Sequence, residues 1–261
     1  MTEDNDLLDK FVPRIKELPE GELKKTDILV PEFLLANEGN VEIRYAPFHH
    51  TNERARAVMV GITPGWTQTE IIFRQTRQYL LRGEPPPEAC RLADQEASFA
   101  GQMRRNLVAM LGELRLQEYL GIPPADLFAP ENSCLLHTTS AIRYPVFIRR
   151  GDDWQNYTGY SPPLVENQLL REYIESKLAD ELGRVRHALF VPLGNSVSAA
   201  LQILVSQGIL TDRQCLIGFP HPAGGNGHRV RQFNEVKPRL MRQVSEWFED
   251  AAHRVPAGTP S

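Results

Sequence analysis

The sequence predicts an α/β fold, a three-layer α/β/α sandwich around a central, mainly parallel four-stranded sheet. Short, continuously apolar runs alternate along the chain with segments whose apolar residues recur at helical spacing. Runs without polar alternation are typical of strands buried on both faces, as in a parallel sheet covered by helices. A length of 261 residues with 41% hydrophobic and 24% charged residues is ordinary for a globular protein. We expect one domain over residues 1–261.

The first half of the chain supplies the first core strand and two helical segments. Residues 1–40 are predicted to form a helical extension that begins with an amphipathic helix, whose apolar side carries Leu7, Leu8, Phe11, Ile15 and Leu18. Residues 41–47 alternate like a strand, and residues 56–65 form an apolar strand that ends in a Pro-Gly turn. A helix is expected to begin near Trp66 and another to span 98–119. The proline run at 85–87 is expected to break the chain between them.

The second half is predicted to add three more core strands, at 133–144, 187–194 and 214–220. Helices are expected around 165–178, 197–205 and 233–247, and a flexible tail at 253–261. Ligands of such folds bind at the carboxyl ends of the strands, where the following turns share one edge of the sheet. The sequence therefore predicts one rim, built from the turns at 61–66, 138–145, 194–195 and 221–229.

Net charge argues against a protein that coats nucleic acid by bulk electrostatics, because the formal charge is -4 and the pI is near 6.0. A local basic face remains open, since basic residues gather in two segments. These are Arg143, Arg149 and Arg150 in one, and His228, Arg229 and Arg231 in the other.

The termini and the cysteines narrow the class of protein further. No apolar run approaches the ~18 residues that span a bilayer, and the N-terminus "MTEDNDLLDK" is acidic where a secretory signal is basic and then apolar. We expect a cytoplasmic protein with no membrane partner. Cys90, Cys134 and Cys215 are scattered without metal-binding spacing, so we interpret them as buried thiols and expect no metal and no cofactor.

Two glycine-rich turns carry the chemistry. In "VGITPGW", residues 60–66, two glycines and a proline force a tight turn whose backbone N–H groups can face a ligand, although a purely structural turn remains open. In "GFPHPAGGNGHR", residues 218–229, glycines allow close backbone approach and a helix begins near Arg229. Its positive end favours an anion at the same place.

Together these turns resemble two motifs of the uracil-DNA glycosylase superfamily, a Gly-x-x-Pro-Gly turn after the first core strand and a His-Pro turn that opens the last helix. The segment "TSAIRYP", residues 139–145, is similar to the family's middle strand. The resemblance covers most of the chain, from Val41 onward. It implies the family's fold, DNA as the partner, and hydrolysis of the bond between a base and deoxyribose.

The resemblance also implies roles for particular positions. Thr63 falls at the water-positioning site, Ser140 at the base-reading site and His221 at the leaving-group site, and only His221 matches the family by residue type. A neutral histidine there donates a hydrogen bond to the departing base anion. Further base contacts are expected from Gly61, Ile62 and Gly65. Trp66 is expected either to stack on the base or to seal the first helix against the sheet.

Departures from the family pattern bear on mechanism and substrate. A threonine cannot act as a base at neutral pH, so the deprotonating group is missing or comes from elsewhere; the candidates are Asp152, Asp153, Glu70 and His137. Ser140 and Ala223 are smaller than the residues usual in the family, which leaves more room. This size argument favours a substrate other than plain uracil, such as the bulky modified cytosines of phage DNA, and hence a role in antiviral defence.

Residues 147–163 are interpreted as a long polar and aromatic loop, which is either functional or a solvated lid. Trp154, Tyr157 and Tyr160 are candidates to stack on an extruded base or wedge into the duplex. Asn156 and Tyr157 are expected to line the pocket. DNA contacts are predicted for Arg149, Arg150, Gly225, Asn226, His228 and Arg229.

The leading hypothesis is a monofunctional, monomeric DNA glycosylase that flips out a modified base and leaves an abasic site. Two alternatives remain open: a non-catalytic nucleic-acid sensor on the same fold, and a hydrolase or transferase of free nucleotides.

Overall fold

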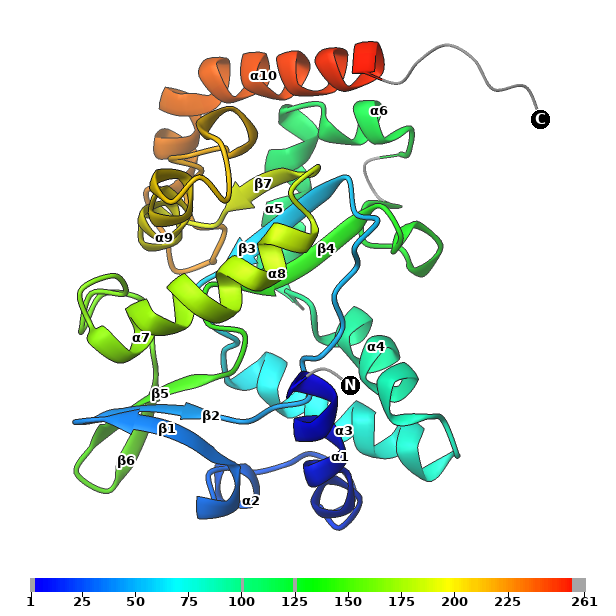
Figure 1. The fold of residues 1–261 in the computed structure, drawn as a ribbon, viewed down its shortest axis with the longest axis vertical. Coiled ribbons are helices and arrows are strands. Elements are labelled where there is room, and N and C mark those ends of the chain that lie inside the picture. The colour runs from blue at the N-terminus through cyan, green and yellow to red at the C-terminus, as the bar shows by residue number, and fades with distance from the viewer. Residues whose placement is uncertain (1–2, 100, 124–125, 255–261) are drawn as a thin grey trace.

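A computed structural model describes residues 3–99, 101–123 and 126–254 and shows a mixed α/β fold (Figure 1). Its centre is a parallel sheet of three strands in the order β4-β3-β7: β3 (Ala57–Gly61), β4 (Leu136–Ser140) and β7 (Leu189–Pro192). Gly61 pairs with Ser140 and Val60 with Pro192, so the carboxyl ends of all three strands meet at one edge.

Helices cover both faces of this sheet, as the side-chain alternation of its strands requires. Val58, Val60 and Phe190 belong to one apolar core, with α9 (Asn195–Ser206) and α8 (Ala179–Arg184). Ala57 and Met59 belong to the other, with α5 (Gln102–Glu113), α6 (Leu116–Leu120) and α10 (Arg229–Arg254). Figure 1 shows α8 and α5 on opposite faces of the sheet. A three-layer arrangement is therefore present around the parallel strands.

The prediction of four core strands was wrong in one element. The segment after η5 (Asp212–Gln214) reaches the sheet edge but forms a single parallel bridge, from Cys215 to Phe190. The chain then turns, with Ile217 N–H bonded to the Cys215 carbonyl and Gly218 at a φ of +88°. That backbone conformation is one that glycine adopts readily and that cannot continue a strand.

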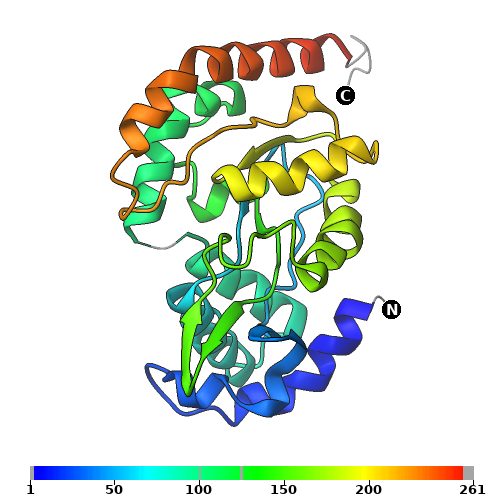
Figure 2. The ribbon, with the colours of Figure 1, turned by 90° about the vertical axis from the view of Figure 1, so that its left-hand side faces the viewer.

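A second, antiparallel sheet lies at the opposite end of the molecule from α10 (Figures 1 and 2). Its order is β1-β2-β5-β6, formed by β1 (Leu34–Glu38), β2 (Val41–Arg44), β5 (Val146–Arg150) and β6 (Asp153–Asn156). The prediction of a long loop at 147–163 was thus wrong in its first half, where β5 and β6 form a β-hairpin. The sequence signal was weak because only Val146, Phe147 and Ile148 of the hairpin strands are buried.

The remaining helices mostly follow the expected positions. The chain begins with α1 (Glu3–Lys16), α2 (Lys25–Ile28) and η1 (Pro31–Phe33), but the helical extension predicted for residues 1–40 is wrong at its end, where the chain forms β1 and pairs with β2. The helix α3 (Trp66–Leu81) starts where predicted. The segment predicted at 98–119 is split between α5 and α6 at Arg115, whose φ is +60°. After η3 (Pro130–Asn132), the helix expected at 165–178 is α7 (Gln168–Tyr173) followed by a π-helical turn, η4 (Ile174–Leu178).

The proline run at 85–87 starts a helix and does not merely break the chain. Pro86 is the first residue of α4 (Pro86–Ala97), which packs against α3. A proline is tolerated there because the first N–H groups of a helix have no intrahelical acceptor. The last helix, α10, runs to Arg254, and residues 255–261 of the predicted tail lie outside the described residues.

The described residues also bear on the predictions about membrane spans and about the three cysteines. None of the described helices has the length and apolar character needed to cross a membrane. Cys90 and Cys215 are buried, and burial raises the pKa of each thiol to about 12, so both are unreactive near neutral pH. Cys134 is exposed, which corrects the prediction that all three thiols are buried.

Candidate functional site

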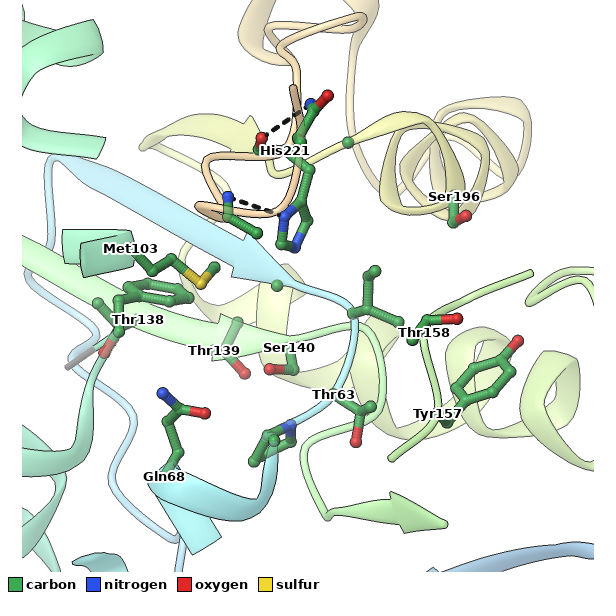
Figure 3. A pocket seen from close by; sticks show the side chains of 18 of the residues that line it. Thr63, Gln68, Met103, Thr138, Thr139, Ser140, Tyr157, Thr158, Ser196 and His221 are labelled. Atoms are coloured by element: carbon green, nitrogen blue, oxygen red, sulfur yellow. Dashed lines mark hydrogen bonds between the residues drawn. The ribbon is translucent and has the colours of Figure 1, made fainter. Parts of the chain in front are cut away.

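A cavity of about 780 Å³ opens at the carboxyl edge of the parallel sheet (Figure 3). All four turns predicted to share a rim contribute to its lining, together with the end of α4. The rim residues include Gly61, Ile62, Thr63, Gly65, Ser140, Gly194, Asn195, His221, Gly225 and Asn226. The prediction that these distant segments meet is confirmed, and the volume lies in the upper part of the range usual for small-molecule sites.

His221 points into this cavity, toward the β3 turn (Figure 3). Its Nδ1 accepts a hydrogen bond from the Ala223 backbone N–H, at 3.2 Å. A nitrogen that accepts carries no proton, so in the neutral ring the proton sits on Nε2. Burial lowers the pKa of His221, which favours that neutral form. The loop therefore presents an N–H donor, held in one tautomer, to whatever occupies the cavity.

Gly194 sets the position of the His221 ring. Its φ of +100° is a conformation that other residues rarely adopt, and a Cβ built there would lie 3.2 Å from the His221 Cβ and 3.5 Å from Cδ2. The absence of a side chain at the start of α9 therefore lets the histidine pack against the end of β7. Gly61 is similarly tight, since its Cβ would lie 3.2 Å from the Ser140 Oγ.

Gly194→Ala is expected to lower the free energy of unfolding by about 1–3 kcal/mol through backbone strain and to displace His221 from the cavity. Gly208→Ala, at the other end of α9, is the matched control: its φ is +72° but a Cβ there meets nothing within 4 Å. Urea denaturation with base-release assays on both variants checks this. Equal losses of activity in both would show that Gly194 does not position the histidine.

Thr63 lines the cavity, but its hydroxyl is already engaged by the backbone. Oγ1 donates to the Tyr144 carbonyl and accepts from the Val146 N–H, both at 2.9 Å. These bonds tie the β3 turn to β5. With its proton committed, the hydroxyl retains one lone pair, so its predicted role in orienting water is limited to accepting from that water.

Of three aromatic and amide residues predicted to contact the base, one lines the cavity and two do not. Tyr157 lines the cavity, and its hydroxyl donates to the Pro162 carbonyl at 2.6 Å. Asn156 is exposed at the end of β6 and is absent from the lining, although its amide nitrogen lies 3.9 Å from a Cβ built on Gly65. Trp66 also lies outside the lining and packs against the core, which favours the interpretation that it seals α3 to the sheet.

The basic residues predicted to contact DNA, which are Arg149, Arg150, His228 and Arg229, do not line the cavity. Arg149 and Arg150 lie on the exposed part of β5, where the Arg149 guanidinium packs 5.5 Å from the Trp154 ring centroid. His228 is exposed outside the cavity. Arg143 is no surface cation at all, because it is 8% exposed and its Nη2 pairs with the Glu181 carboxylate at 2.8 Å.

The glycine-rich loop is held by its own polar residues. The Asn226 amide donates to the His221 carbonyl at 3.2 Å and to the Gln232 side chain at 3.0 Å. Arg229 donates to the Ala223 carbonyl at 3.1 Å. Two predicted DNA contacts thus organise the loop that carries His221, whereas Gly225 is exposed on the cavity wall.

Comparison with known proteins gives a relative along nearly the whole chain. "Uncharacterized protein YoxB" of Bacillus subtilis (strain 168) is 37% identical over 239 residues, which is 91% of each chain. The chain belongs to the YoxB family. No protein-family model matches it. Among solved structures, the SMUG2 protein of Pedobacter heparinus overlaps with a TM-score of 0.41 and 12% identity, covering 94% of this chain and 98% of that one.

In this member of the YoxB family, α4 forms a part of the cavity wall that the sequence did not predict. Asp94 and Ser98 line it there, with Ser98 Oγ 2.7 Å from Thr138 Oγ1 of β4, and Gln68 and His50 also line the cavity. Burial raises the pKa of Asp94 to about 7, against the opposing effects of His137 and Arg143. No signal in the sequence marked Asp94, because α4 itself was not predicted.

A buried ionic cluster lies behind this wall. The Glu181 carboxylate contacts His137 Nε2 at 2.8 Å and Arg143 Nη2 at 2.8 Å. Burial alone would raise the pKa of Glu181, but the Arg143 charge and the hydrogen bond with His137 lower it to about 2. Burial and the nearby His137 lower the pKa of His50 to about 4, so His50 is neutral at physiological pH.

The candidates proposed for the missing base do not reach the cavity. Glu70 accepts from the Leu23 N–H and from Arg74, and His137 is paired with Glu181. Asp152 and Asp153 are exposed at the hairpin of β5 and β6. The carboxylates that do line the cavity are Asp94 of α4 and Glu235 of α10. Within the described ranges, no group of three or more His, Cys, Asp or Glu side chains is arranged to hold a metal ion.

Proposed function

We propose that this protein is a DNA glycosylase that binds an extruded base in the 780 Å³ cavity and hydrolyses its bond to deoxyribose. The observation that carries the proposal is the tautomer of His221. A neutral imidazole with Nδ1 bonded to the Ala223 N–H presents Nε2–H as a donor inside a partly enclosed site. The sequence motifs that resemble the uracil-DNA glycosylase superfamily provide the second line of support.

In the proposed reaction the bond between the base nitrogen and C1′ breaks, and its electron pair leaves with the base. The His221 Nε2–H donates to the base carbonyl oxygen on which the negative charge accumulates. Water adds to C1′ and loses a proton to solvent, and the base anion takes up a proton after release. The histidine keeps its own proton throughout, which agrees with the lowered pKa of His221.

The size of the cavity supports a substrate larger than plain uracil. A single pyrimidine ring fills only part of 780 Å³. Ser140 and Ala223 contribute short side chains to the wall, and Gly61 contributes none. We therefore propose a modified base, with the bulky cytosines of phage DNA as the leading class and antiviral defence as the setting.

The test is release of base from a panel of duplexes, each with one modified or unmodified base, followed by alkaline cleavage of abasic sites. Mass spectrometry of the small-molecule fraction identifies the free base. We expect the protein to produce both an abasic site and a free base from at least one duplex. Lack of product from every duplex, including phage DNA, would refute the proposal.

Tyr160 is expected to help the enzyme act on duplex DNA. Its side chain is 64% exposed and lies at the cavity wall, where it can stack in the place of the extruded base. Because base–aromatic stacking contributes about 1–3 kcal/mol, Tyr160→Ala should slow base release from duplex by about 5- to 150-fold and from single strands much less. Leu81→Ala, at a side chain 55% exposed and outside the cavity, is the control. A Tyr160→Ala effect equal on both substrates would contradict the wedge role.

A non-catalytic sensor of nucleic acid is the second candidate, favoured by one observation. The Thr63 hydroxyl, at the predicted water site, has its proton bonded to the Tyr144 carbonyl. A sensor would bind the same modified duplexes and release no base. Parallel measurements of duplex binding and base release therefore separate the two candidates.

A further inference from the structure

Asp94, Ser98 and Thr138 line the cavity side by side, because Ser98 Oγ contacts both of the other side chains. We call this polar part of the wall the recess. Thr138 and Ser140 lie two residues apart on β4 and so share a face of the sheet, about 7 Å from each other. Figure 3 shows both hydroxyls on the cavity wall. If Ser140 contacts the ring of the bound base, the recess lies where a substituent on that ring would extend.

Asp94 has unused hydrogen-bonding capacity in this recess. It is only 9% exposed, and its one side-chain bond to a described residue is a long contact of 3.5 Å with Ser98 Oγ. Ser98 Oγ is much closer to Thr138 Oγ1, at 2.7 Å. Buried carboxylates normally accept several hydrogen bonds from the protein, because an unsatisfied charge is costly there. An under-bonded carboxylate on a cavity wall is therefore suited to accept from a ligand.

The charges around the recess favour a neutral donor. The charged groups around Asp94 are Arg143 and His137 from β4 and the turn after it, Glu181 from α8 and Arg104 from α5. Glu181 pairs with both His137 and Arg143, and the Arg104 guanidinium donates to the Ser98 carbonyl. A phosphate or carboxylate on the ligand would be repelled by Asp94. A hydroxyl adds no charge, donates to the carboxylate, and accepts from the Ser98 or Thr138 hydroxyl. The Phe99 ring beside Gly61 supplies an apolar wall for a carbon skeleton.

We propose that Asp94, with Ser98 and Thr138, forms a specificity subsite that binds hydroxyl groups carried by a substituent of the excised base. This inference rests on the proposed glycosylase function and deepens it. It identifies the substrate class as a base with a hydroxylated side group, and it assigns the discrimination to α4 and β4 and not to the His221 loop.

The test compares base release from three duplexes, which contain cytosine, 5-hydroxymethylcytosine or its glucosylated form. The quantity measured is the ratio of the single-turnover rate on each hydroxylated base to that on cytosine. Loss of a hydrogen bond to a charged partner should lower this ratio about 10- to 100-fold in Asp94→Asn, with a smaller fall in Ser98→Ala. Asp180→Asn, at an exposed aspartate whose side chain is 77% accessible, is the matched control.

An unchanged ratio in Asp94→Asn, or a wild-type protein that prefers cytosine, overturns the proposal. If the wild-type protein releases no base at all, the glycosylase function fails, and binding decides on the subsite. Duplexes whose target nucleotide carries a 2′-fluoro group resist hydrolysis and permit that measurement. Tighter binding of the hydroxylated duplexes by wild type than by Asp94→Asn then supports the subsite, whereas equal affinities refute it.

Discussion

His221→Ala should slow base release by about 100- to 1,000-fold, the usual effect of removing one donor to developing negative charge. The imidazole Nε2–H is the donor that the cavity directs at the departing base, and its tautomer is fixed by the Ala223 N–H. The reduction should fall on the rate of the chemical step and much less on binding of DNA. Single-turnover kinetics at saturating protein, with binding measured separately by fluorescence anisotropy, distinguish these two effects.

Two variants serve as controls for that result. His228→Ala removes a second histidine of the same loop, which is exposed and outside the cavity, and should leave the rate within about threefold of wild type. His221→Gln keeps an N–H donor and should recover part of the lost rate. If His221→Ala were as active as His228→Ala, the imidazole would have no part in the chemistry.

The rim of the site could be predicted from the sequence because a parallel sheet imposes it. Gly61, Ser140 and Gly194 each follow or end an apolar run of strand length, and parallel strands place such ends together. His221 joins them although the segment before it makes only one bridge with the sheet. A single bridge beside β7 is enough to bring the turn to the edge, so the error in strand number left the location of the site intact.

The partners of polar side chains could not be predicted in this way. Thr63 reads as a free hydroxyl in a turn, but its partners lie at Tyr144 and Val146, which are brought close by the second sheet. Arg143 was interpreted as part of a basic face, yet Glu181, 38 residues away, neutralises it in the interior. Sequence shows which groups carry charge, whereas burial and pairing depend on contacts between distant segments.

The position of Asp94 on the cavity wall could not be predicted either, since an aspartate within a polar helix gives no sign of facing a cavity. Its α4 neighbours Ala89, Cys90, Ala93 and Ala97 are small and buried, which places that face of the helix in the interior. The helix is short and begins at a proline, a residue that is also typical of breaks in the chain. The site at this end therefore became visible only in the folded structure.

Asp94→Asn is expected to stabilise the protein at alkaline pH, because the wild-type carboxylate is buried without adequate hydrogen bonds. Burial raises the pKa of Asp94 from 3.8 to about 7 in the folded state. Below pH 4 both the folded and the unfolded chain hold the proton, and the residue causes no penalty. Between pH 4 and 7 the unfolded chain releases its proton first, so folding stability falls as the pH rises.

Above pH 7 the penalty is complete, and about three pH units of displacement correspond to about 4 kcal/mol. Asp94→Asn should therefore exceed wild type in free energy of unfolding by that amount at pH 8 and match it near pH 4, by urea denaturation at both values. The exposed Asp180→Asn control should show no such difference. Retaining a destabilising carboxylate on a cavity wall fits a residue kept for binding at the expense of stability. A variant no more stable than wild type at pH 8 would mean that the Asp94 carboxylate is well solvated, and the recess would then lack the unsatisfied acceptor on which its binding role depends.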